Sequence, residues 1–299
     1  DARCRPYLAL PVALLALALL QVRDMHDVGA LAVVGAVSIL VPCCIVLAEI
    51  LSAPPQAGAH TEFVAVGQPA TRMGAGIMDI VFAYAGQAIF VELQTDMAKP
   101  SAFPRAVSAS LVVMVATYVA ISAVGYANVN AAFLRSGLPI TSCMRSEAAL
   151  RVVNVLLFVH VMLAYVIEAN VLARGVCWAL GSSDTVSGSA RRDRLRWLGV
   201  TAAIVGCSYL VSNTLPFFSD LMAVMATNAV LIAYVIPVVL LLRLCPVGRR
   251  ERIFCMIVLP LALALALVGS TASIIEMVSK LKATPPFSCG NSTTASCAA

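Results

Sequence analysis

The strongest constraint on this 299-residue chain is a repeated pattern of long apolar segments. Eight can be marked, over residues 6–22, 28–51, 77–94, 106–127, 151–173, 197–213, 218–242 and 253–275. Most approach the roughly 20 residues that a helix needs to cross a bilayer. Only 12% of the residues are charged, about half the usual share in soluble domains. The sequence therefore predicts an all-α polytopic membrane protein, with a transmembrane domain over 1–275 and a polar tail over 276–299.

Basic residues indicate the orientation of these segments, because cytoplasmic loops are enriched in Lys and Arg. The connections 23–27, 95–105, 174–196 and 243–252 hold 12 of the 20 basic residues. We therefore expect these connections to face the cytoplasm, where the basic loop 174–196 would lie near anionic lipid headgroups. Both ends of the chain would then lie on the exoplasmic side.

The C-terminal tail has the composition of an exoplasmic segment. Asn291-Ser-Thr is an N-glycosylation sequon, and Cys289 and Cys297 flank it. Glycosylation at Asn291 and a disulfide between the two cysteines both suit a luminal or extracellular tail. Cys4 and Cys143 are a second candidate pair on the same side.

The segment 77–94 has features that an ordinary membrane span lacks. Its 18 positions cover roughly 27 Å of helix, slightly less than the roughly 30 Å of hydrocarbon. It also holds a Gly-Gln pair, a tyrosine and a carboxylate, and a backbone interruption is tolerated only where protein or water satisfies it. We therefore expect a broken helix and a substrate site; the alternative is a Gly-mediated helix contact with the glutamine bonded across helices. The candidate substrate-binding residues are Phe82, Tyr84, Ala85, Gly86 and Gln87.

Four further residues are candidates for coupling or gating: Glu92, His160, Tyr165 and Glu168. Ionisable groups inside membrane spans are functional candidates by default. Glu92 either acts as a gate or proton carrier, or pairs with Lys99. His160 either titrates during transport or bonds to a neighbouring helix. For Glu168, an ion pair with Arg174 is the preferred interpretation.

Several motifs resemble the amino acid/auxin permease family in order and spacing. The stretch Phe82-Ala-Tyr-Ala-Gly-Gln-Ala-Ile-Phe-Val-Glu-Leu-Gln94 is similar to the sixth transmembrane helix of that family. Val159-His-Val-Met-Leu-Ala-Tyr165 resembles the eighth helix, and Tyr234-Val-Ile-Pro237 resembles the tenth. Leu215-Pro-Phe-Phe-Ser-Asp220 resembles the turn between helices nine and ten, and Gly269-Ser-Thr-Ala-Ser-Ile-Ile275 fits the last helix.

The resemblance implies an inverted-repeat amino acid transporter fold with a broken helix. Eight of about eleven transmembrane helices would be present, with helices one to three preceding this chain. The implied function is secondary active amino acid transport by alternating access, coupled to H⁺ or Na⁺, in the plasma membrane or a vacuolar or endosomal membrane. Plant members often carry His where this chain has Gln87, and glutamine carries no proton at neutral pH, so no proton relay is expected at that position.

Two other classes of function stay open: a receptor or sensor built on a transporter fold, and a polytopic membrane enzyme. An enzyme is expected to group its catalytic residues, whereas His26, His60 and His160 fall in three separate regions. The sequence has no Gly-rich phosphate loop, zinc-spaced Cys/His set or basic-aromatic alternation. We therefore expect no enzymatic activity, no metal or cofactor apart from a coupling ion, and no nucleic-acid partner; the expected partners are an amino acid and the lipid bilayer.

Overall fold

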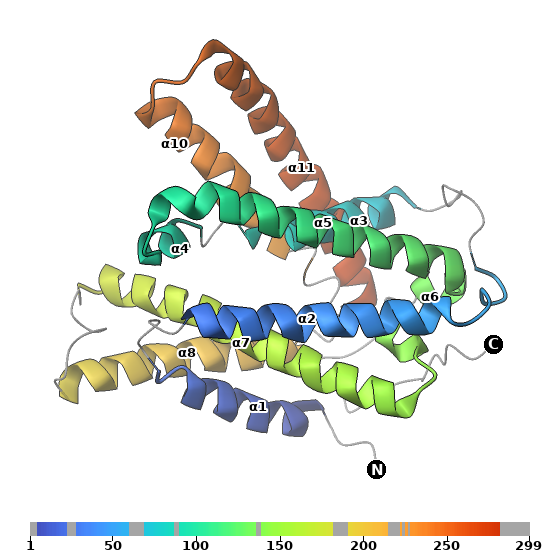
Figure 1. The fold of residues 1–299 in the computed structure, drawn as a ribbon. Coiled ribbons are helices and arrows are strands. Elements are labelled where there is room, and N and C mark those ends of the chain that lie inside the picture. Colours follow the sequence, from blue (N-terminus) through green and yellow to red (C-terminus); the bar gives the residue numbers. More distant parts are fainter. Residues whose placement is uncertain are drawn as a thin grey trace.

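A computed structural model describes residues 5–22, 28–59, 69–86, 90–135, 139–181, 191–214, 222, 225–226 and 228–281. Figure 1 shows a bundle of helices. The α-helices are α1 (Arg5–Leu19), α2 (Val28–Leu51), α3 (Ala70–Ala83), α4 (Phe90–Asp96), α5 (Phe103–Asn128), α6 (Ala131–Arg135), α7 (Glu147–Ala179), α8 (Arg191–Thr214), α10 (Ile236–Leu244) and α11 (Arg249–Leu281). Shorter helical turns are η2 (Pro100–Ala102), η3 (Ile140–Cys143) and η4 (Leu231–Val235).

Several of these helices are suited to a membrane. Five stretches of the described residues are long and apolar enough to cross one, judged by length and composition: Ala32–Leu51, Pro100–Asn128, Glu147–Ala179, Arg191–Thr214 and Arg249–Ile275. Shorter apolar helices run over Pro6–Leu19 and Asn228–Leu244. Large apolar side chains face outward, such as Val112 and Leu267, each 69% exposed. Apolar surface of this extent is typical of contact with lipid, so the chain is an all-α polytopic membrane protein.

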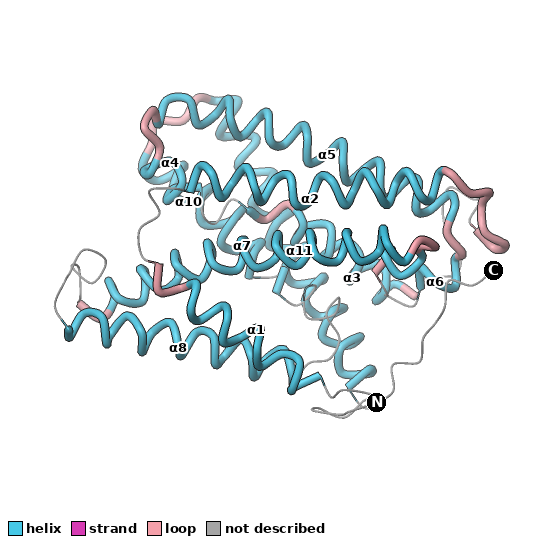
Figure 2. The backbone as a smooth tube through the Cα atoms, turned by 60° about the horizontal axis from the view of Figure 1, so that its bottom comes forward, coloured by secondary structure: helices cyan, strands magenta, loops and turns pink. Residues whose placement is uncertain are grey.

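Successive helices run in alternating directions through the bundle. In Figure 1, α2, α5 and α8 begin on the left and α7 ends there. Figure 2 shows α5 and α2 above α7 and α8 from a second direction. The described helix ends beside three predicted cytoplasmic connections, 23–27, 95–105 and 174–196, therefore lie on one side, as expected of helices that repeatedly cross a bilayer.

Helix α3 begins earlier than the sequence predicts. It starts at Ala70, whereas the predicted apolar segment starts at 77, because Arg72 and the neighbouring glycines lower the local hydropathy. Asp79, near the start of the predicted segment 77–94, therefore lies inside α3. Packing against α11 explains why the helix extends this far, since a Cβ on Gly74 would lie 2.9 Å from Ala272 Cβ.

Candidate functional site

The helix that carries the candidate substrate residues is broken in the structure. Helix α3 ends at Ala83 and α4 begins at Phe90. At the end of α3, the N–H groups of Tyr84 and Ala85 each donate to the carbonyl three residues earlier, at 3.2 and 3.0 Å. This tightened spacing commonly ends a helix. The interruption predicted within 77–94 is therefore confirmed.

Two tyrosine hydroxyls reach the carbonyls at this break. Tyr118 Oη from α5 donates to Ala83 O, and Tyr234 Oη from η4 donates to Tyr84 O, both at 3.5 Å. These are long hydrogen bonds. The rings of Tyr84 and Tyr118 also pack edge to face, with centroids 5.4 Å apart and planes at 76°. Because carbonyls at a helix end lack partners within the helix, hydroxyls from two other elements supply their polar contact.

Tyr234 reaches the break from a turn of π-helix. In η4 the Ile236 N–H donates to Leu231 O, five residues back. Pro237 accounts for the wide turn, because proline has no N–H and its ring crowds the carbonyl four residues earlier. Turns of this kind are frequent at functional sites. The Tyr-Val-Ile-Pro motif thus combines a wide helical turn with the hydroxyl that donates to the break.

The other predicted substrate residues have different surroundings. Phe82 is half-buried and packs against an apolar cluster formed by Met78, Ala226, Val230, Ala262 and Ala266. Its ring thus has a packing role, and its part in substrate binding stays a prediction. Ala85 is half-buried, whereas Gly86 is exposed, and a Cβ added to Gly86 would meet nothing within 4 Å. Gln87 lies outside the described residues, so its role stays a prediction.

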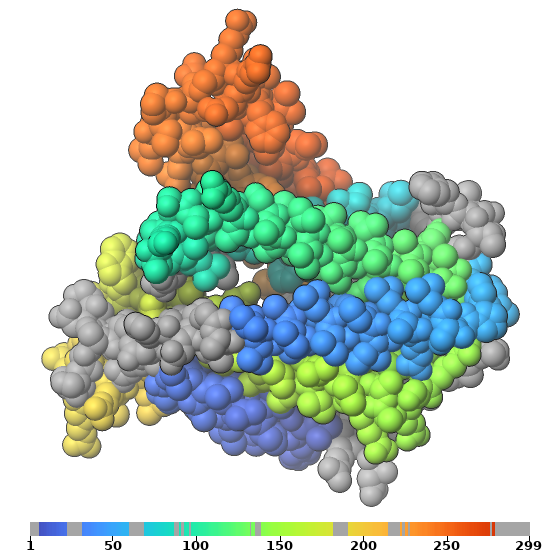
Figure 3. All heavy atoms as spheres, in the orientation of Figure 1, coloured from blue at the N-terminus to red at the C-terminus, as the bar shows by residue number. Residues whose placement is uncertain are grey.

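One face of the molecule shows an opening between two helices. Figure 3 shows an opening between α5 and α2, with teal atoms of the α3 region at its bottom. Tyr118 of α5 is 38% exposed. The open space beside Gly86 agrees with this hollow. Among the described residues, the backbone at Gly86 therefore has space beside it.

Two of the candidate coupling residues tie α7 to its neighbours. His160 Nδ1 lies 2.9 Å from Gly35 O on α2, a contact that requires the proton on Nδ1. This is the interhelical bond that the sequence left as one of two interpretations. Tyr165 Oη donates to Ser208 Oγ on α8 at 3.2 Å. A part in coupling stays a prediction for both residues.

The two acidic candidates for coupling or gating are Glu168 and Glu92. Glu168 is exposed on α7, and its ion pair with Arg174 stays a prediction. The two residues are six positions apart, which places them about 120° apart around the helix. Glu92 belongs to α4, but its side chain lies outside the described residues.

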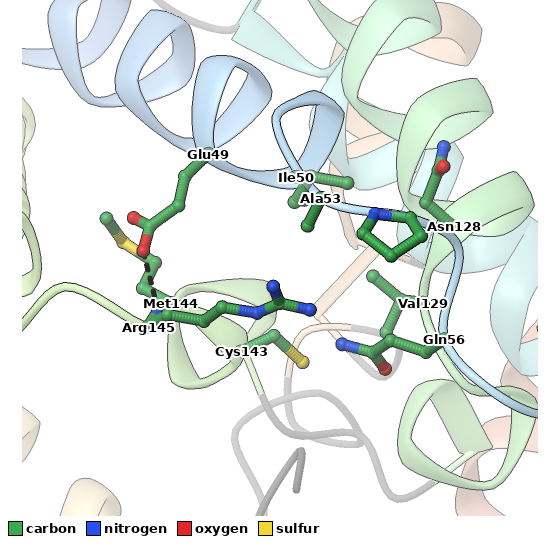
Figure 4. A pocket seen from close by; sticks show the side chains of 10 residues that line it. Glu49, Ile50, Ala53, Gln56, Asn128, Val129, Cys143, Met144 and Arg145 are labelled. Atoms are coloured by element: carbon green, nitrogen blue, oxygen red, sulfur yellow. Dashed lines mark hydrogen bonds between the residues drawn. The ribbon is translucent and has the colours of Figure 1, made fainter. Parts of the chain in front are cut away.

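A second hollow lies between the end of α2 and the start of α7. Figure 4 shows Glu49 and Arg145 beside it, with Gln56 and Asn128 across the opening. Glu49 Oε1 accepts hydrogen bonds from the N–H groups of Arg145 and Ser146, at 2.6 and 2.7 Å. About 20 Å³ is accessible to the centre of a water molecule, room for about one water. This hollow is too small for an amino acid. The hydrogen bonds of Glu49 beside it join the end of α2 to the start of α7.

The candidate modification sites of the tail, Asn291, Cys289 and Cys297, lie outside the described residues and stay predictions. Cys143 is disulfide-bonded, which agrees with its predicted exoplasmic position. The other described cysteines are free: Cys43, Cys44, Cys177, Cys207, Cys245 and Cys255.

The sequence interpretation missed the contribution of Tyr118. The available signal was a tyrosine in the middle of the apolar segment 106–127, where its hydroxyl needs a polar partner. That signal does not name the partner. Tyr234 was noticed only as part of a motif, without a role.

Membrane-crossing helices, one of them broken beside polar groups, are typical of polytopic membrane transport proteins. The family model described as "Transmembrane amino acid transporter protein" matches residues 2–279. The chain therefore belongs to this transporter family, which confirms the predicted resemblance and indicates amino acid transport across a membrane. Comparison with curated proteins and with solved structures gave no match.

Proposed function

We propose that this protein is a secondary active amino acid transporter that works by alternating access and is coupled to H⁺ or Na⁺. The observation that carries the proposal is the helix break between Ala83 and Phe90, with its carbonyls turned toward other elements. Such carbonyls hold partial negative charge at the end of a helix. They suit the ammonium group of an amino acid, or a coupling cation.

The proposed substrate site consists of the broken backbone at Tyr84, Ala85 and Gly86 together with the hydroxyls of Tyr118 and Tyr234. A carbonyl oxygen has two lone pairs, so it can accept from a tyrosine and from an ammonium group together. The hydroxyls would then orient the carbonyls before substrate arrives. Pre-orientation of this kind raises affinity by lowering the entropy lost on binding.

Full-length protein in sealed proteoliposomes is expected to accumulate a labelled amino acid above its outside concentration under an inward H⁺ or Na⁺ gradient. Passive carriers only equilibrate their substrate, so accumulation that an ionophore abolishes identifies secondary active transport. Each gradient is imposed separately to identify the coupling ion. Equilibration without accumulation under both gradients contradicts coupling, and binding without flux indicates a sensor on a transporter fold.

Removing the two hydroxyls is expected to weaken substrate binding. Tyr118→Phe and Tyr234→Phe should each raise the KM of uptake about two- to fivefold, because a neutral hydrogen bond contributes about 1 kcal/mol and these are long. The rings, and with them most of the packing, are kept. The measurement is KM and maximal rate in proteoliposomes, corrected for the amount of inserted protein.

Tyr209→Phe is the matched control for these variants. Its hydroxyl also donates to a backbone carbonyl, Pro6 O, at 3.2 Å, and it joins α8 to α1 away from the break. An unchanged KM in a variant that carries both Tyr118→Phe and Tyr234→Phe, or an equal rise in Tyr209→Phe, argues against the tyrosine site.

A further inference from the structure

Helix α8 begins with a dense group of arginines. Arg191, Arg192, Arg194 and Arg196 are all exposed and are accompanied by one acidic residue, Asp193. Arg192 and Arg196 share a face because they are four residues apart, and Arg191 lies one turn before Leu195. Arg191, Arg192 and Arg196, with Leu195, line a shallow open hollow on the surface, which we call the arginine face.

The backbone beneath the arginine face is firmly anchored. Trp197 is completely buried (0% exposed) and packs with Ala173 and Cys177 of α7. Its Nε1–H donates to Leu20 O, just after α1, at 2.9 Å. One turn further along α8, Thr201 is also completely buried and bonds within the helix to Trp197 O. The arginine face therefore belongs to a helix whose next residue, Trp197, is anchored in the bundle.

The depth of the arginine face matches that of lipid headgroups. The apolar segment of α8 starts at Trp197, and the turn from Arg191 to Arg196 rises about 7.5 Å beyond it. The headgroup layer on each side of the hydrocarbon is roughly 5–8 Å thick. Trp178, at the end of the neighbouring α7, is 76% exposed, as expected for a tryptophan at the membrane interface.

We propose that the arginine face is a binding site for the phosphate groups of an anionic phospholipid headgroup. Guanidinium groups present paired N–H donors that match phosphate oxygens, and three of them around one hollow suit a headgroup with more than one negative charge. The neighbouring apolar surface of α8 would lie along the acyl chains, with Leu198 42% exposed. The site is separate from the helix break, so it requires neither the proposed substrate nor the proposed coupling ion.

The test is binding of a fluorescent short-chain phosphatidylinositol bisphosphate to the full-length protein in neutral detergent. The triple variant Arg191→Gln, Arg192→Gln, Arg196→Gln should bind about 100-fold more weakly, because each basic side chain near an anionic lipid surface contributes roughly fivefold. The matched control replaces the same number of exposed arginines at the start of α11, with Arg249→Gln, Arg250→Gln and Arg252→Gln. Binding by the control should be nearly unchanged.

Two further binding measurements test the same site, one with a lysine variant and one with a soluble headgroup. Triple replacement by lysine keeps the charge but removes the guanidinium fork, so we expect a loss of lipid affinity smaller than that of the glutamine variant. If gel filtration shows that the glutamine variant is not folded, the lysine variant replaces it in the test. Soluble inositol trisphosphate should bind much more weakly than the lipid. Equal losses in the α8 and α11 variants, no loss in the α8 variant, or equally tight binding of the soluble headgroup would each overturn the proposal.

Discussion

Amino acid uptake is expected to fall to background when Gly86 is replaced by tryptophan. Gly86 is exposed beside the break, and a Cβ there meets nothing within 4 Å. The Cβ of the new side chain therefore meets no described neighbour, and we expect the indole to exclude a ligand from the carbonyls of Ala83 and Tyr84. We expect a loss of uptake of at least about tenfold, measured with labelled substrate in proteoliposomes.

Gly206→Trp is the control for this result. Gly206 is also exposed, and a Cβ there likewise meets nothing within 4 Å, but it lies in the middle of α8. Both variants add the same apolar surface, so both should insert to similar levels, and Gly206→Trp should keep its uptake. Full activity in Gly86→Trp would contradict the assignment of the substrate site to the break.

The break itself could be predicted because its causes are local. A short span that contains Gly86 beside a glutamine and Tyr84 is poorly suited to lipid whatever surrounds it. The start of α3 could not be predicted in the same way, because Arg72 lowers the hydropathy of residues that are nevertheless helical. Contact with α11, which lies far along the chain, holds this part of α3 in place.

The surroundings of the break could not be predicted from the sequence. Tyr118 and Tyr234 lie 34 and 150 residues from Tyr84, and only the packing of α5 and η4 brings their hydroxyls to it. His160 shows the same limit, since its position inside an apolar segment fits a titrating group or a structural bond equally well. The contact with Gly35 O appears only when α2 and α7 are placed side by side.

Of the variants described, replacement of Gly269 by leucine is expected to cause the largest loss in the free energy of unfolding. Gly269 of α11 lies against Met78 of α3, and a Cβ at Gly269 would overlap the Met78 sulfur and Cγ. Met78 is completely buried (0% exposed) within the apolar cluster, so its side chain has no free space to enter. Overpacking of this kind costs about 1–3 kcal/mol, more than leucine gains over glycine in a helix, which is less than the roughly 0.8–1 kcal/mol that separates glycine from alanine.

The sign of this effect separates crowding from helix propensity. Gly206→Leu gains the same propensity with no neighbour within 4 Å, so its melting temperature in detergent should be unchanged or higher, whereas that of Gly269→Leu should fall. If crowding against Met78 is the cause, Met78→Ala in the Gly269→Leu background should recover part of the loss. A melting temperature of Gly269→Leu equal to that of Gly206→Leu would mean that α3 and α11 do not pack this closely. The broken helix would then lack the support of α11, because α11 packs against α3 and α3 ends at the break, at Ala83.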